Sequence, residues 1–256
     1  MISVRSIVMS IGAFVLSLLL SHLPSQVAIA DSAQKKFVGN DACESCHQAQ
    51  IQDWTNSHHD LAMQEVNEKT VLGDFDNATF IYEGVTTTFF RKGDEYWVKT
   101  DNKNGELRDY RVAYVFGVYP LQQLLLPIQK GQLNALSIAW DARNASEGGQ
   151  RWFHIYEGQE PITAESPLHW TGVYHNWNSR CAECHSTNVV KGYDTERQQY
   201  STTYEQIDVG CEACHGPGSR HIELATAGKV DRSQSPSEMG LALSLAARGQ
   251  WSYNDH

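Results

Sequence analysis

The chain has no cysteine outside three short repeats, and this absence excludes most of the usual roles of cysteine. All six cysteines fall in CESCH (43–47), CAECH (181–185) and CEACH (211–215). No thiol is left for nucleophilic or redox work. Three disulfides, which six cysteines in an exported chain would normally suggest, are disfavoured because every cysteine belongs to the same repeated pattern.

The sequence also has no excess of basic residues. The sequence has 20 Lys and Arg against 30 Asp and Glu, which gives a formal net charge of -10. This balance argues against nucleic acid as a partner. With 256 residues, of which 41% are hydrophobic, the chain can form a packed core in one large or two small domains.

Long apolar runs are missing after the N-terminus. Residues 7–23 read IVMSIGAFVLSLLLSHL and precede a small-x-small pattern at Ala28 and Ala30, which predicts a secretory signal peptide over residues 1–30. The alternative is a retained membrane anchor, but this run is short and polar residues interrupt it. We therefore expect an exported, periplasmic protein without a membrane span after cleavage.

Each repeat has the pattern C-x-x-C-H, which is the attachment signature of a c-type haem. Two thiols at this spacing reach the two vinyl groups of the porphyrin, and the adjacent histidine becomes the proximal iron ligand. The sequence thus predicts three covalent haem c groups. Their attachment residues are Cys43, Cys46, Cys181, Cys184, Cys211 and Cys214, and their proximal ligands are His47, His185 and His215.

Zinc is the main alternative, because Cys181, Cys184, Cys211 and Cys214 have the spacing of a four-cysteine site. A four-thiolate site does not need the histidine that follows every pair. It would also leave Cys43 and Cys46 without partners. Export further favours haem attachment over zinc.

Methionine is scarce, which bears on the second axial ligands. The mature chain has only Met63 and Met239, whereas histidines outnumber the remaining ligand positions. Bis-histidine ligation is therefore the expectation, with lower potentials than His/Met ligation gives.

The first candidate for a second ligand follows the first motif. The segment QDWTNSHHDLAM (52–63) predicts a helix, on which only one of His58 and His59 can face a haem. We favour His59. Met63 is expected to be a packing residue.

His221 follows the proximal His215 by six residues, a span of at most about 20 Å. The intervening GPGS favours a turn, so ligation of a neighbouring haem, that of His185 or His47, is easier than passing around the rim of its own. The alternative is a surface histidine after a turn.

Three further histidines lie among aromatic residues, as expected beside a haem face and in ordinary cores alike. We rank His169 first as a second ligand, His154 next and His175 last.

The predicted fold is α+β and loop-rich, with short helices around the haems and an inserted antiparallel β-meander. Residues 78–118 are rich in Val, Thr, Phe and Tyr, and RKGDE and DNKNGE predict hairpin turns, so we expect the meander to span residues 75–141. This stretch has neither cysteine nor histidine. We expect a first haem segment at 31–74, a β-rich insertion at 75–150, second and third haem segments at 151–235, and a helical tail at 236–256.

Three segments carry a resemblance to a known family: IAWDARNASEGGQRWFHIYEG, SPLHWTGVYHNWNSRCAECHSTN and IDVGCEACHGPGSRH. They resemble the multihaem cytochromes of the c554-like group, above all exported proteins with this haem domain ahead of tetratricopeptide repeats. The resemblance spans residues 37–256. It implies haem attachment at the three motifs, and ligand positions at His59, within S-x-H-x-x-A, and at His221, within GPGSxH.

Members of this group usually continue into further C-x-x-C-H motifs or helical repeats, which the chain lacks. We therefore expect an N-terminal portion, a truncated reading frame or a short paralogue.

Three functions remain open. We favour electron transfer through mostly bis-histidine haems between redox partner proteins, including other multihaem cytochromes, because candidate ligands are abundant. The first alternative is an oxidoreductase of nitrite or hydroxylamine with one open haem, to which Tyr174, His175, Arg180 or Tyr193 would contribute. The second is a structural or sensing module. An electron carrier is expected rather than a catalyst.

Overall fold

The computed structural model describes residues 35–231 and 233–242. The chain divides into the units Met1–Lys35 and Lys36–His256, and the description below concerns the second. The expected signal peptide and residues 243–256 of the expected tail lie outside the described residues. The described part combines short helices, antiparallel sheets and long loops, which confirms the predicted fold class.

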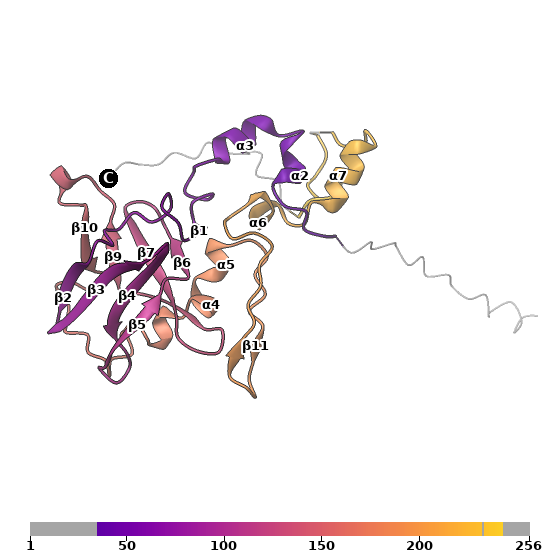
Figure 1. Ribbon diagram of the computed structural model, residues 1–256. Coiled ribbons are helices and arrows are strands. Elements are labelled where there is room, and N and C mark those ends of the chain that lie inside the picture. The colour runs from indigo at the N-terminus through magenta and orange to yellow at the C-terminus, as the bar shows by residue number, and fades with distance from the viewer. Residues whose placement is uncertain (1–34, 232, 243–256) are drawn as a thin grey trace, which may run out of the picture. The chain divides into compact units, whose positions relative to one another are not determined.

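Four consecutive strands form an antiparallel meander in the order β2-β3-β4-β5 (Figure 1). They are β2 (Ala78–Tyr82), β3 (Val85–Lys92), β4 (Glu95–Asp101) and β5 (Leu107–Arg111). The predicted turns are present, since RKGDE joins β3 to β4 and DNKNGE joins β4 to β5. Gly93 and Gly105 adopt φ values of 61° and 77° in these turns, a region that glycine enters without a Cβ clash.

A second antiparallel sheet has the order β1-β6-β7-β9-β10, with β8 also paired to β7. Its strands are β1 (Met63–Glu65), β6 (Tyr114–Phe116), β7 (Leu121–Pro127), β8 (Leu133–Ala135), β9 (Ile138–Asp141) and β10 (Arg151–His154). Strand β1 follows the first motif and β10 leads toward the second. The sheet thus includes strands from the segments that precede and follow the β-rich residues 75–150.

Side chains from both sheets meet in one hydrophobic core. Phe89 of β3 is fully buried, and its ring stacks on that of Trp152 of β10 with centroids 3.6 Å apart and an interplanar angle of 3°. Phe75 contacts both rings edge-on. The alternation of buried and exposed residues along β4 produces one face toward this core.

Short helices lie in and next to the motifs. They are α2 (Asp41–Glu44), α3 (Gln48–Trp54), α4 (Trp177–Arg180), α5 (Ala182–His185), α6 (Cys211–His215) and α7 (Ser219–Thr226), with 3-10 turns η2 (Ala145–Glu147) and η3 (Val173–His175) and the small hairpin β11 (Tyr193–Asp194) and β12 (Gln199–Tyr200). None of the helices among residues 35–231 and 233–242 has the length and apolar character needed to cross a bilayer.

The helix predicted over residues 52–63 is wrong. Helix α3 ends at Trp54, and Asn56 adopts a positive φ of 61°. The reason is local: Asp60 Oδ2 accepts the Asn56 N–H, while the Ser57 hydroxyl accepts the N–H groups of His59 and Asp60. Such bonds compete with helical ones, so His58 and His59 lie in turns.

A second hydrophobic cluster ties the β-sheet to the second motif. It contains Met63, Phe116 and Trp177, each at most 7% exposed, and Cys181 packs against it. Met63 is therefore a packing residue, as the sequence predicted.

Candidate functional site

The first and third C-x-x-C-H motifs are held together by direct contacts. The Asn40 side chain, just before α2, accepts the Cys211 N–H at 2.9 Å. The Glu212 carboxylate accepts the Val38 and Gly39 N–H groups. Residues ahead of the first motif thereby lie against the helix that carries the third, although some 170 residues separate them in sequence.

The second motif is joined to the third through the residues that follow it. Thr187 Oγ1 donates to the Asp208 carbonyl at 2.8 Å and accepts the Gly210 N–H at 2.9 Å. Ser186 Oγ donates to the Ile207 carbonyl at 2.9 Å. All three motifs therefore belong to one hydrogen-bonded assembly.

The hydrogen bond of His185 fixes which of its ring nitrogens could bind a metal ion. Its Nδ1 lies 3.1 Å from the Ala62 carbonyl oxygen, which can only accept, so Nδ1 carries the proton. The lone pair is then on Nε2. Metal-binding histidines commonly have this arrangement, with the second nitrogen bonded to a carbonyl.

His221, on α7, lies beside His47, the histidine of the first motif. Their ring centroids are 6.2 Å apart and their planes are inclined by 29°. His221 Nδ1 donates to the Met239 carbonyl at 2.8 Å, so its lone pair is also on Nε2. The structure thus brings two of the predicted ligands together.

This separation is compatible with two imidazoles that would hold one metal ion. A metal–imidazole bond is about 2 Å long, and the ring centroid lies about 1 Å behind the bonded nitrogen, so two trans rings have centroids about 6 Å apart. The His47–His221 pair therefore has the separation that bis-histidine ligation requires.

None of the six cysteines, all of which lie in the described part of the chain, forms a disulfide. In each motif the second cysteine is exposed: Cys46, Cys184 and Cys214. Burial raises the pKa of the Cys181 thiol. Among the described residues, no three or more His, Cys, Asp or Glu side chains form a group that could hold a metal ion, and the four cysteines of the zinc alternative are not assembled into one.

The Cys43 and Cys211 thiols contact each other across two motifs. Hydrogen bonding to Cys211, burial and then the nearby charges raise the pKa of Cys43, while the same hydrogen bond lowers the pKa of Cys211 to about 7. The attachment points of the first and third motifs are therefore neighbours.

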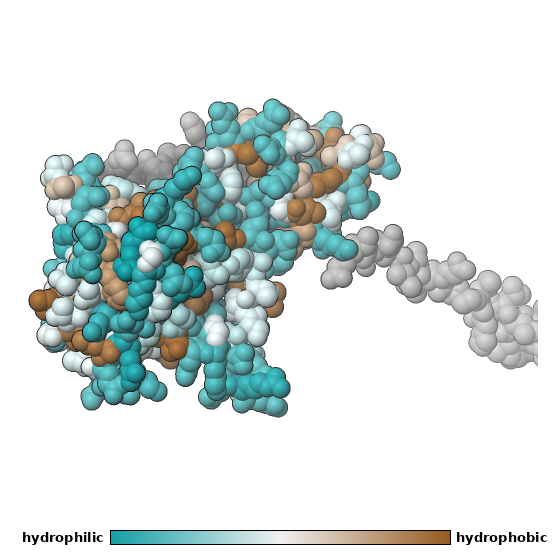
Figure 2. Space-filling view, viewed as in Figure 1, coloured by the Kyte–Doolittle hydropathy of each residue, from teal (hydrophilic) through white to brown (hydrophobic). Residues whose placement is uncertain are grey.

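The donor set is suited to covalent haem. Each motif offers two thiols and an adjacent histidine, and His221 is available opposite His47. Figure 2 shows small apolar patches over the region of α6 and α7, and others over the β-strands, on a largely hydrophilic face. The apolar faces of a porphyrin suit such surroundings.

His59 is exposed, and its backbone contacts residues near the second and third motifs. Its carbonyl accepts the N–H groups of Ala62 and Val209. Ala62 in turn contacts His185, and Val209 lies two residues before Cys211. Ligation by His59 stays a prediction.

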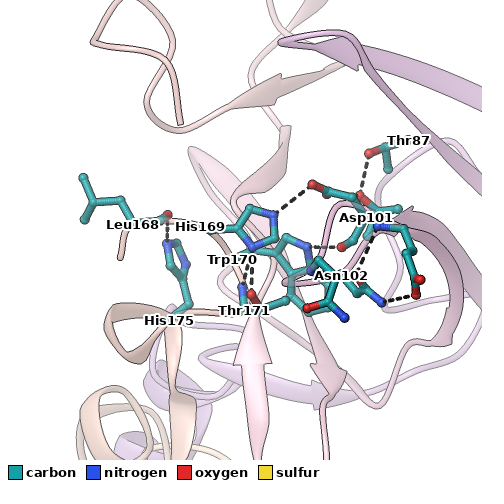
Figure 3. A network of polar contacts seen from close by, with 11 residues as sticks. Thr87, Asp101, Asn102, Leu168, His169, Trp170, Thr171 and His175 are labelled. Atoms are coloured by element: carbon teal, nitrogen blue, oxygen red, sulfur yellow. Dashed lines mark hydrogen bonds and ion pairs between the residues drawn. The ribbon is translucent and has the colours of Figure 1, made fainter. Parts of the chain in front are cut away.

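His169 lies in a buried polar network with residues of the meander (Figure 3). Its Nδ1 accepts the Thr171 N–H, so Nε2 carries the proton and donates to Asp101 Oδ2 at 3.1 Å. Trp170 Nε1 donates to the Asp101 carbonyl at 2.9 Å. Ligation by His169 stays a prediction and would require it to give up the contact with Asp101.

His154 and His175 lie in the same region. His154 stacks on Tyr82 with centroids 3.7 Å apart, and burial followed by the charges of His175 and His169 lowers its pKa to about 4. His175 Nε2 contacts the Leu168 carbonyl at 3.1 Å. A cavity of about 30 Å³, lined in part by His154, His169 and Asp101, has room for only one or two waters.

Two residues of the assembly had no signal in the sequence. Glu212 occupies a variable position inside the third motif, and Asn40 precedes the first. Both are buried. Their side chains bond to backbone N–H groups far away in sequence, which no local pattern encodes.

Comparison with known proteins gives a family match. Residues 42–79 and 154–216 match the family model described as cytochrome c554 and c-prime. The match contains the three motifs, and residues 80–153, which include most of the meander, lie outside it. No curated protein matches the sequence.

One solved structure is similar in part. It is described as the crystal structure of outer cell wall cytochrome OcwA, with 21% sequence identity and a TM-score of 0.46. The similarity covers 80% of this chain and 36% of that chain. This chain thus spans about a third of the length of that cytochrome.

Proposed function

We propose that the chain is a multihaem c-type cytochrome that acts as an exported, periplasmic electron carrier with three covalent haems; the three C-x-x-C-H motifs and the family match over residues 42–79 and 154–216 support this. Haem iron supplies the redox chemistry by alternating between ferric and ferrous states. The polypeptide holds each haem in place, supplies its axial ligands and sets its surroundings.

The observation that carries this proposal is the His47–His221 pair. The two rings lie 6.2 Å apart, and the His221 hydrogen bond leaves the lone pair on Nε2, so His47 and His221 would together hold one haem iron. An iron held by both histidines would have no open position for substrate. This arrangement favours electron transfer over catalysis.

The contacts between motifs support a chain of closely spaced haems. Cys43 and Cys211 lie in contact, and Thr187 joins the segments around the second and third motifs. Short separations between haems make electron transfer along such an assembly fast. Its partners on this proposal are redox proteins, including other multihaem cytochromes.

The test is a combination of haem counting and spectroscopy on the full exported protein. Pyridine haemochrome analysis should give three c-type haems per chain, and low-temperature EPR should show mainly low-spin iron. Fewer haems would refute the count. A dominant high-spin signal, or nitrite or CO binding to a native haem, would instead support an open-site oxidoreductase.

A further inference from the structure

Glu212 is a buried acid inside the third motif, between Cys211 and Cys214. The residue is 3% exposed. Glutamate is almost never this deeply buried unless it has partners that replace water. The identity of those partners defines what the side chain does.

Its partners are backbone N–H groups from two distant segments. Oε2 accepts from Val38 at 2.9 Å and from Gly39 at 2.8 Å, while Oε1 accepts from Val38 at 3.0 Å and from Gly218 at 2.7 Å. One carboxylate thus connects the chain ahead of the first motif with the GPG turn after the third.

Neighbouring contacts extend the same connection. Lys36 N–H donates to Ser219 Oγ at 2.9 Å, and Ser219 N–H donates to the Lys36 carbonyl at 3.2 Å. Ser219 begins α7, the helix that carries His221. The position of His221 opposite His47 therefore depends on the segment that Glu212 holds.

The carboxylate also introduces a negative charge. An ionised carboxylate is acceptor-only, which matches a set of partners made of N–H donors. Because Glu212 is buried and lies between Cys211 and Cys214, solvent screens its charge only weakly at the attachment site of the third haem. Its contacts with Val38 and Gly39 place the same charge beside the chain that leads to Cys43.

From these contacts we infer that Glu212 is a positioning residue that locks the first motif onto the third and lowers the reduction potential of the haems on both. The inference rests on the proposed function for the presence of these haems. A fixed negative charge stabilises ferric over ferrous iron, because reduction removes one positive charge.

The sequence offers a matched control. Glu44 occupies the same place in the first motif, CESCH, as Glu212 in the third, CEACH, but it is exposed. Glu212→Gln and Glu44→Gln change the net charge equally. Glu212→Asp keeps the charge but shortens the side chain by one methylene. This variant distinguishes the effect of the hydrogen bonds from the effect of the negative charge.

Two measurements on the haem-loaded protein test the inference. Amide hydrogen exchange at Val38, Gly39 and Gly218 should be roughly tenfold or more faster in Glu212→Gln and Glu212→Asp than in Glu44→Gln. In a spectroelectrochemical titration, Glu212→Gln should raise the ferrous-to-ferric ratio at fixed potential roughly tenfold, as expected for the loss of a unit charge that solvent screens weakly. Glu212→Asp should titrate like the native protein.

The inference is overturned if Glu212→Gln and Glu44→Gln behave alike in both measurements. If Glu212→Gln yields no haem-loaded protein, Glu212→Asp decides: native exchange at Val38 and Gly39 would overturn the inference. These outcomes are distinct from failure of the proposed function, which would appear in the native protein as a wrong haem count or an open iron.

Discussion

The buried contact between Asp101 and His169 yields a prediction whose size follows from the structure. His169 Nε2–H donates to Asp101 Oδ2 at 3.1 Å, and the two side chains are 11% exposed or less. Asp101→Ala leaves this donor buried without a partner. A buried neutral donor without a partner costs about 1–3 kcal/mol of unfolding free energy.

The same contact predicts energetic coupling. His169→Phe removes the donor and leaves Asp101 with the Thr100 hydroxyl, at 3.4 Å, as a side-chain partner. A hydrogen bond to a charged group contributes about 1.5–3 kcal/mol, so the double mutant should be more stable than additivity predicts by at least about 1.5 kcal/mol. Urea unfolding of the haem-loaded variants, followed by far-UV circular dichroism, measures both values.

EPR of His169→Phe then separates a structural role from iron ligation. A structural pair leaves the low-spin signal unchanged. Coupling below about 0.5 kcal/mol would refute the reasoning, since independent sites add within that margin. A shift of one haem to high spin would show that His169 is an iron ligand, as predicted from the sequence.

Two further predictions concern the β-sheet core. Burial lowers the pKa of His154 from 6.5 to about 4, so between these pH values the unfolded chain binds this proton and the folded protein does not. The free energy of unfolding should therefore fall as the pH drops from 6.5 to 4. We expect a loss of about 1–2 kcal/mol after allowance for screening. His154→Phe should remove this part of the pH dependence in urea unfolding, whereas an unchanged profile would contradict it. Phe89→Ala, which removes a fully buried ring stacked on Trp152, should cost about 3–5 kcal/mol. A loss below about 1 kcal/mol in the same assay would show that the core does not depend on this ring.

The sequence predicts the cofactor chemistry and the meander because both depend on local patterns. A C-x-x-C-H motif places its ligands within five residues, and RKGDE supplies a turn next to alternating side chains. The helix predicted over residues 52–63 is wrong for the opposite reason. Its apolar residues suit a helix, but the side chains of Ser57 and Asp60 bond to nearby backbone groups instead.

Pairings between distant segments are not encoded locally. The sequence offered both His185 and His47 as neighbours of His221, and the structure places His221 beside His47. Likewise, the sequence gives Glu44 and Glu212 the same place in their motifs, yet only Glu212 is buried among N–H groups. Tertiary packing decides such cases.

The separation of His47 and His221 also gives the central claim its most direct test. Low-temperature EPR of the full haem-loaded protein should be compared for His221→Ala and the control His58→Ala, which removes an exposed histidine from a turn. If His47 and His221 ligate one iron, His221→Ala should convert about a third of the low-spin signal to high spin while His58→Ala leaves it intact. Every iron remaining low-spin in His221→Ala would contradict the claim.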